Sequence, residues 1–197
     1  PRAPSDQRSA PPDIPPALRR SFVAATMADA GPAYAVRTES MGGGSVLVVQ
    51  GPRQGLRAEF RPGAVRIGKT RRSKEEGIPR ETAGERGEKI EGDWRLELSL
   101  IGVGRDGALG PVGETTPQAA GNRVEYRHDG LTEWYVHGPL GLEQGFTVER
   151  RPAGAGPLVV GAALSSNLDA SLAKDGSAVE LRDGAGGLRV AYRDVSA

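Results

Sequence analysis

The chain has 197 residues, 37% of them hydrophobic and 5% aromatic, and no stretch approaches the roughly 20 apolar residues that span a bilayer. Its 26 lysines and arginines against 25 acidic residues give a net charge of +1, and the signs alternate along most of the chain, which argues against a nucleic-acid partner. The absence of cysteine excludes disulfides, thiol nucleophiles, Cys-ligated zinc and iron–sulfur clusters.

Residues 1–16 contain six prolines and almost no apolar pattern, which predicts an extended Pro-rich arm. Two interpretations stay open for this arm: a solvated tail, or a segment that becomes ordered on a partner. The chain does not open with a basic and apolar leader, so we expect that a signal peptide has been removed or that the chain is a fragment.

One helix is predicted at about residues 14–30. Apolar residues recur there at helical spacing, a capping residue and two prolines suit its first turn, and Gly31 followed by Pro32 ends it. The residues that carry this prediction are Asp13, Ile14, Pro15, Pro16, Leu18, Phe22 and Ala25. The narrow apolar stripe should pack on a sheet.

From Tyr34 onward the apolar period changes to two, which predicts short strands bounded by Gly, Pro and Asp. Four Asp-Gly pairs separate such runs, where tight hairpins need residues that tolerate positive φ. We therefore predict a mostly β fold for residues 17–197: a single domain, an antiparallel β sandwich or barrel of about ten short strands with one N-terminal helix. The candidate strands are 34–39, 45–50, 56–60, 64–67, 94–101, 123–127, 132–136, 145–150, 158–164, 178–182 and 188–192.

A charged insertion at residues 68–92 interrupts this pattern, with 13 of its 25 residues charged. Connections of this length are usually functional or disordered, and both interpretations stay open. As a docking loop it supplies the candidate partner contacts Arg71, Arg72, Lys74, Glu75, Ile78 and Arg80.

Two glycine motifs match nucleotide-binding patterns by letter. Residues 63–70 fit the phosphate-loop pattern, but Val65 and Ile67 alternate as in a strand, and no helix series surrounds them. Residues 102–107 fit the dinucleotide pattern, but no helix can begin after Gly107 to hold a pyrophosphate. We therefore predict hairpins at both places and no cofactor.

Catalytic and metal-binding patterns are weak. The two histidines, His128 and His137, neighbour carboxylates, yet the chain has no G-x-S-x-G elbow and no closely spaced calcium ligands. We predict surface histidines, no metal and no enzymatic activity. A hydrolase with paired carboxylates remains an unfavoured alternative, drawn from Asp129, Glu133, Glu143 and Glu149.

Trp134 and Tyr135 form the densest aromatic cluster. In a strand they point to opposite faces, so one belongs to the core and the other is a candidate contact for a protein or a glycan, unless the second face is also covered. Both are therefore candidate partner-binding residues.

The run Asn122–Val148, with its Glu-Trp-Tyr and Gly-Leu-Glu-Gln-Gly-Phe segments, resembles the non-catalytic β domain that precedes FG-GAP (integrin-like) or immunoglobulin-like repeats in secreted bacterial surface proteins. Residues 55–66 and 93–98 are similar to its early strands, and the resemblance covers about residues 34–197. It implies export and a β architecture, and no catalytic residues. The long insertion and the lack of following repeats depart from that pattern.

The functional hypothesis is a non-catalytic structural or interaction domain: a periplasmic or cell-surface accessory or scaffolding subunit with protein partners in a larger envelope complex. Peripheral membrane association through a partner is compatible with it. The alternative is a carbohydrate-binding module that stacks sugars on Trp134 or Tyr135.

Overall fold

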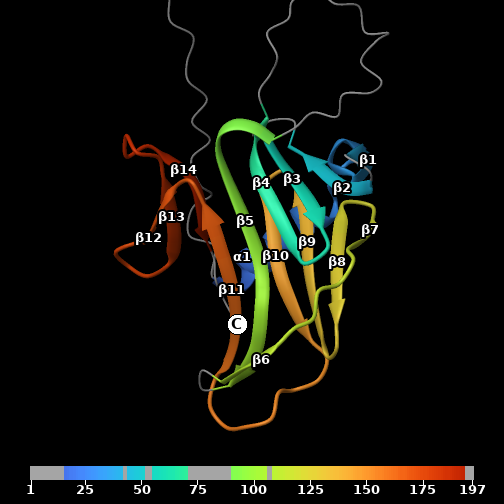
Figure 1. Ribbon diagram of the computed structural model, residues 1–197, viewed down its shortest axis with the longest axis vertical. Helices are drawn as coiled ribbons and strands as arrows, with labels where there is room; N and C mark the ends of the chain where they lie inside the picture. The colour runs from blue at the N-terminus through green and yellow to red at the C-terminus, as the bar shows by residue number, and fades with distance from the viewer. Residues whose placement is uncertain (1–15, 42–43, 52–54, 71–89, 106–107, 194–197) are drawn as a thin grey trace, which may run out of the picture.

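The computed structural model describes residues 16–41, 44–51, 55–70, 90–105 and 108–193 (Figure 1). These ranges contain a helix, a 3-10 turn and fourteen strands, with antiparallel pairing throughout. In chain order the elements are α1 (Pro16–Ala28), η1 (Pro32–Tyr34), β1 (Arg37–Met41), β2 (Gly44–Gln50), β3 (Leu56–Arg61), β4 (Ala64–Thr70), β5 (Ile90–Arg105), β6 (Ala108–Pro111), β7 (Gln118–Ala120), β8 (Arg123–His128), β9 (Leu131–Gly138), β10 (Gly141–Val148), β11 (Leu158–Ser166), β12 (Asp169–Leu172), β13 (Ala178–Arg182) and β14 (Leu188–Arg193).

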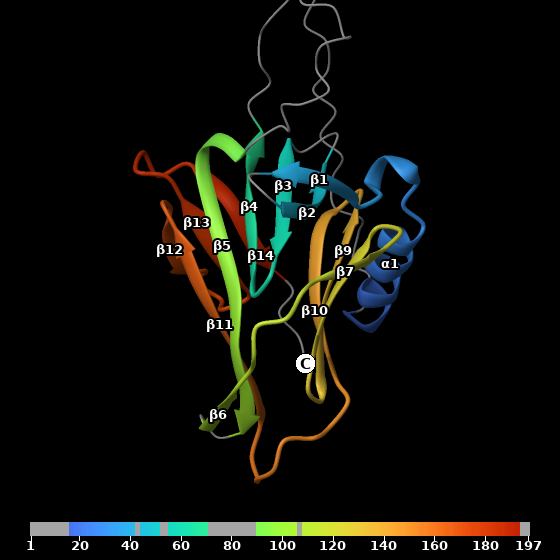
Figure 2. The same cartoon turned by 45° about the vertical axis from the view of Figure 1, so that its right-hand side comes forward.

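The strands form three sheets. The front sheet has the order β1-β2-β3-β4-β5-β11, with β6 also paired to β5; the back sheet has the order β10-β9-β8-β7; and the side sheet has the order β12-β13-β14. Front and back sheets pack face to face, and the side sheet lies beside β11 and β5 (Figures 1 and 2). The predicted β fold with an N-terminal helix is confirmed, and of the two architectures it is the sandwich.

All three sheets contribute to one hydrophobic core, because the period-two alternation directs one face of each strand inward. The front sheet supplies Phe60 and Trp94, the back sheet Val124 and Tyr135, and the side sheet Leu181. Each of these side chains is less than a tenth exposed. The side sheet thus belongs to the same packed interior as the two large sheets.

Helix α1 lies on the outer side of the back sheet (Figure 2). Met27 packs directly on Gly138 of β9, where a Cβ would approach the Met27 sulfur to 2.7 Å. The Asn122 amide donates to the carbonyls of both Met27 and His137, at 2.8 Å each. The helix ends at Ala28 rather than at residue 30, and residues 14–15 lie outside the described part of the chain.

Several predicted boundaries are corrected. Tyr34 belongs to the 3-10 turn η1, so the first strand begins at Arg37. The charged insertion is shorter than 68–92, because β4 runs to Thr70 and β5 begins at Ile90, with these two residues paired. The hydrogen bonds between neighbouring strands are made by the backbone alone. Charged and small residues can therefore lengthen a strand beyond the part that the alternation of apolar side chains predicts. The short strands β6, β7 and β12 were not predicted.

Both glycine motifs are hairpin segments, as expected. Gly63 sits in the β3–β4 turn with φ at 70°, and β4 follows it directly. Gly102 and Gly104 lie within β5, which pairs with β6. Asp129-Gly130 connects β8 to β9 with Gly130 at φ 76°.

Candidate functional site

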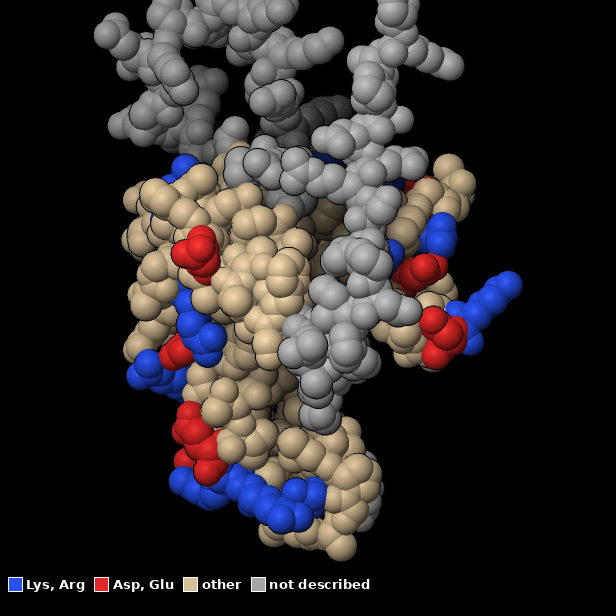
Figure 3. All heavy atoms as spheres, turned by 180° about the vertical axis from the view of Figure 1, so that it is seen from behind, with Lys and Arg blue, Asp and Glu red and all other residues tan. Residues whose placement is uncertain are grey.

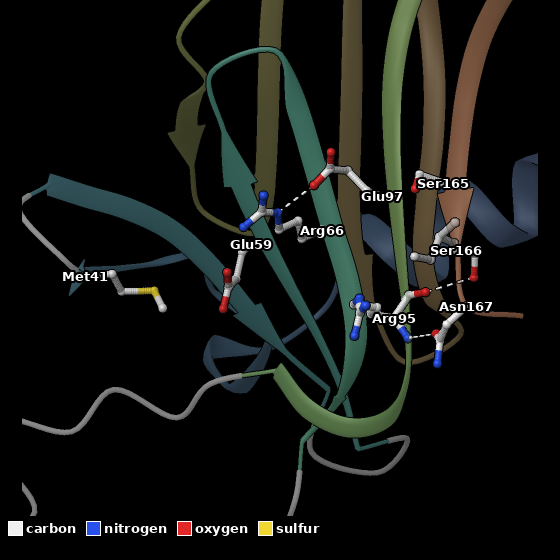
Figure 4. A pocket seen from close by; sticks show the side chains of 9 residues that line it. Met41, Glu59, Arg66, Arg95, Glu97, Ser165, Ser166 and Asn167 are labelled. Carbon is white, nitrogen blue, oxygen red and sulfur yellow. Dashed lines mark hydrogen bonds and ion pairs between the residues drawn. The ribbon is translucent and has the colours of Figure 1, made fainter.

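A pocket of about 510 Å³ lies on the outer face of the front sheet (Figure 4). Strands β1, β3, β4, β5 and β11 each place at least one side chain around it, so its floor is a continuous sheet. The lining residues are Met41, Glu59, Arg66, Arg95, Leu96, Glu97, Ser165, Ser166 and Asn167. Seven of these nine residues are polar, so a ligand with polar groups can be bound here.

A buried ion-pair network lies at one side of this pocket. Arg57 of β3 is 0% exposed, and its guanidinium donates to Glu39 of β1 at 2.7 and 3.2 Å and to Glu59 at 3.2 Å. Glu59 also accepts from Arg61 at 2.9 Å. Alternate residues of β3 share the outer face of the sheet, which is why Arg57, Glu59 and Arg61 meet there.

Burial is the largest single influence on the pKa of Arg57 and acts to lower it, but the bonds to Glu39 and Glu59 outweigh it, so the pKa is raised overall. Arg57 therefore remains charged and hydrogen-bonded to Glu39 and Glu59. Because buried charges must be paired, this network has a structural role and leaves no free charge for a ligand.

Arg95 of β5 differs from the other arginines of the pocket. The Asn167 side chain accepts from the Arg95 amide at 2.8 Å and donates to the Asp93 carbonyl at 3.0 Å, while the Ser166 hydroxyl donates to the Arg95 carbonyl at 2.8 Å. These bonds fix the backbone at Arg95. Its guanidinium has no hydrogen-bond or ion-pair partner in the described part of the chain, and it extends from β5 in the direction of Glu59 and Arg66 (Figure 4).

The remaining charges of the pocket are paired. Arg66 donates to Glu97 at 2.6 Å, and both side chains are partly exposed. With Arg57 and Arg61 each bound to Glu59, the guanidinium of Arg95 is a charge on this face that no described residue balances. A planar guanidinium with five donors is suited to a carboxylate or another oxyanion, and the Ser165 hydroxyl, which is opposite Glu97 in the β5–β11 register, lines the same pocket.

The predicted aromatic pair is divided between the two faces of the back sheet. Trp134 lies on the outer face, where its ring covers Gly145 and the Arg123 guanidinium stands 4.5 Å from the ring centroid. A sugar stacked on Trp134 would have to displace Arg123. Tyr135 is the core member, 1% exposed, so its place among the partner contacts is corrected: it offers no surface.

Tyr135 belongs to a buried polar network inside the sandwich. Its hydroxyl donates to Glu133 at 2.7 Å, the Gln144 amide donates to Glu133 at 2.7 Å, and Tyr192 of the side sheet donates to Gln144 at 2.9 Å. Burial and the Glu133 charge raise the pKa of Tyr126, Tyr135 and Tyr192, which keeps these hydroxyls protonated.

Three carboxylates of the hydrolase alternative lie apart from one another, and the fourth, Glu149, accepts a hydrogen bond from Thr132 at 2.6 Å. Glu133 points inward, Glu143 lies on the opposite face of the back sheet, and Asp129 is in the exposed β8–β9 turn. Burial raises the pKa of Glu143, and Arg123 acts in the opposite direction. Glu133 does line a smaller cavity of about 170 Å³ with Glu114 and His128.

The histidines are less exposed than predicted. His137 is 1% exposed, with its Nδ1 3.0 Å from the Tyr34 carbonyl and its ring edge-on to Tyr34. His128 is partly buried, with its Nδ1 3.0 Å from the Gly113 carbonyl. Carbonyls only accept, so both Nδ1 atoms carry the proton. The two rings lie at opposite ends of the back sheet and cannot share a ligand.

The candidate contacts in the insertion, Arg71, Arg72, Lys74, Glu75, Ile78 and Arg80, lie outside the described residues, as does the Pro-rich arm up to residue 15. Within the described ranges, no three histidines or acidic residues are grouped to hold a metal ion. None of the described helices has the length and hydropathy to cross a membrane.

Comparison of the chain with models of protein families, with curated proteins and with solved structures found no match. The site must therefore be interpreted from its own geometry. Sequence reasoning missed Arg95 and Arg66, because alternating Arg and Glu on a strand is typical of any solvated face. The one available signal was the alternation of Arg57, Glu59 and Arg61, with two charge signs on the side of β3 opposite the core.

Proposed function

We propose that this protein is a non-catalytic interaction domain that binds an acidic segment of a protein partner in the pocket of the front sheet. The observation that carries the proposal is Arg95, whose guanidinium has no partner among the described residues and whose backbone is fixed by Ser166 and Asn167. Because the backbone at Arg95 is already fixed, only the side chain has to become ordered on binding. The neighbouring Arg66–Glu97 pair and Met41 supply a mixed rim suited to a peptide.

Two further observations support an interaction role over the alternatives. Of the carboxylates considered for hydrolysis, Glu133 lies on the inner face of the back sheet and Glu143 on its outer face, and the Trp134 ring is already occupied by Arg123 and Gly145. On the back-sheet side, acidic and basic side chains lie beside one another (Figure 3), and ion pairs such as Arg127–Glu125 use those charges internally. The pocket with Arg95 is therefore the better binding site.

The setting that we propose is extracytoplasmic: an accessory or scaffolding subunit of an envelope assembly or cell-surface protein. Support for this part comes from the resemblance of residues 122–148 to bacterial surface domains. Fractionation of the source cells with an antibody against the chain tests it. Recovery with the cytoplasmic fraction would contradict the proposed setting and leave the pocket proposal standing.

The pocket is tested with a fluorescein-labelled glutamate-rich peptide and a glutamine-rich peptide of equal length, measured by anisotropy at several salt concentrations. We expect the acidic peptide alone to bind, and Arg95→Gln to weaken binding by about five- to ten-fold, since a charge-assisted hydrogen bond is lost. Arg151→Gln, which removes an exposed arginine of the β10–β11 connection, is the matched control. Equal affinity of the wild type and Arg95→Gln would refute the assignment.

A further inference from the structure

Strand β11 forms an open edge of the front sheet. It pairs with β5 along its whole length, and no backbone hydrogen bond to its other side occurs in the part of the chain that the structure describes. An edge strand directs every second N–H and C=O outward, which makes it a template for another strand.

The other edge strands carry features that discourage such pairing. Charged residues occur on β1 (Arg37 and Glu39), on β14 (Arg189 and Arg193) and on β10 (Glu143), which is also partly buried at seven of its eight residues. Strands β6, β7 and β12 have three or four residues each. By contrast, β11 has nine residues and contains neither a charge nor a proline; five of its residues are exposed and four are partly buried.

The sequence of β11 is suited to antiparallel pairing with itself. In an antiparallel pair, two opposed residues either both direct their N–H and C=O toward the partner strand or both direct them away. When the two strands are copies of one sequence, opposed positions therefore differ by an even number, and the two-fold axis lies at a residue that is opposite its own copy. An axis at Gly161 places Leu158 opposite Leu164 of the second copy, and Val160 opposite Ala162. Leu158 is 38% exposed and Leu164 is 42% exposed, and both lie on the same face of the strand.

The surroundings of Gly161 add apolar surface at the same axis. A Cβ at Gly161 would meet Leu109 Cδ1 at 2.5 Å and Ile101 Cγ1 at 3.2 Å, so both side chains lie over this glycine. Ile101 is 50% exposed and Leu109 is 36% exposed. A two-fold axis here brings both side chains against their counterparts, while the small residues of β11 let the backbones approach.

We propose that the chain forms a symmetric dimer by antiparallel pairing of β11 with β11 of a second copy, centred on Gly161, so that two front sheets become one continuous sheet. Ser165 and Ser166 of β11 also line the Arg95 pocket, but the dimer depends on the edge of β11 and not on Arg95, so either proposal can fail without the other. Leucine pairs across the axis contribute apolar burial, and the outward backbone groups contribute the hydrogen bonds.

Sedimentation velocity and light scattering across the micromolar range test the dimer. We expect a dimer for the wild type and a dissociation constant raised at least about ten-fold for Leu164→Lys, which places a charge in the interface. Leu172→Lys, at a leucine of β12 that is 68% exposed, should remain dimeric. Circular dichroism verifies that both variants fold. A monomeric wild type, a dimeric Leu164→Lys, or dissociation by both variants would each overturn the proposal.

Disulfide trapping tests the register, and the chain has no native cysteine to interfere. The double variant Leu158→Cys/Leu164→Cys should cross-link under mild oxidation, because opposed residues lie about 4.5–5.5 Å apart between Cα atoms. Within one chain the two positions are about 20 Å apart, so the bond must join two copies. Each single variant should stay uncross-linked. Equal cross-linking of the single variants, or none in the double variant, would rule out the Gly161 register.

Discussion

Two carboxylates, Glu59 and Glu133, are buried in this sandwich, and each is satisfied in a different way. Glu59, on the outer face of the front sheet, receives the guanidinium groups of Arg57 and Arg61. Glu133, inside the sandwich, receives the neutral donors of Tyr135 and Gln144. Both arrangements obey the requirement that buried polar groups be hydrogen-bonded.

His137 is the buried residue that should make stability depend on pH. Its Nδ1–H donates to the Tyr34 carbonyl, while Nε2 is buried without a partner in the described part of the chain. Burial lowers the pKa of His137 below its ordinary 6.5; the bond to Tyr34 opposes this, and the charge of Arg37 lowers the pKa further. Protonation would add a buried N–H that has no acceptor.

We therefore predict that His137 makes its full contribution to the unfolding free energy above about pH 6.5. This contribution falls as the pH drops from there toward the lower pKa of the folded state, because His137 in the unfolded state takes up its proton first. Urea denaturation of the wild type and of His137→Gln from about pH 7.5 to pH 5 measures it. Subtracting the two curves cancels the other titrating groups. A difference that stays constant with pH would contradict the assignment.

At the scale of elements, the position of α1 depends on a single glycine. The helix contacts β9 where Gly138 lets Met27 reach the sheet, and the Asn122 amide bonds both segments. A side chain at position 138 would meet the Met27 backbone as well as its sulfur, since a Cβ there lies 3.1 Å from Met27 Cα. The contact is therefore a close backbone approach of the kind that only glycine permits.

Gly138→Ala should lower the unfolding free energy by about 1–3 kcal/mol, the usual cost of overpacking a tight contact. Thermal or urea denaturation measures this loss, and partial release of α1 should reduce the helical signal in circular dichroism. Gly184→Ala is the matched control, because nothing lies within 4 Å of a Cβ at position 184. Equal effects of the two substitutions would show that α1 is not held by this contact.

On the scale of the whole molecule, the three sheets share one interior. Leu181 of the side sheet is fully buried in the cluster that contains Trp94 and Tyr135, and Tyr192 joins the side sheet to the back sheet through Gln144. A shared core couples the elements that surround it, so the chain from α1 to β14 should unfold as one cooperative unit.

Accordingly, unfolding followed by tryptophan fluorescence and by far-UV circular dichroism should give coincident transitions. Leu181→Ala should shift both together and lower the unfolding free energy by about 2–5 kcal/mol through loss of buried surface and a cavity. Leu172→Ala, at an exposed leucine of β12, should change it by less than about 0.5 kcal/mol. Two separate transitions would instead mean that the side sheet folds independently.

Alternation of apolar and polar residues was sufficient to predict most strands, the inward faces of β5 and β8, and the hairpins at the Asp-Gly turns. These are local properties, set by the two-residue period of a strand and by backbone preferences in turns. The helix was predictable for the same reason. Strands β6, β7 and β12 were not, because they are short and exposed and form only where a neighbouring ladder receives them.

The candidate site was decided by tertiary structure. Sequence pattern treats Arg57 and Arg95 alike, as outward residues of alternating strands, yet one is buried among carboxylates and the other has no partner among the described residues. Likewise the pattern required that one of Trp134 and Tyr135 be in the core and could not say which. Charge pairing and burial depend on which strands become neighbours and on what packs against each face, and these are long-range properties that no local period encodes.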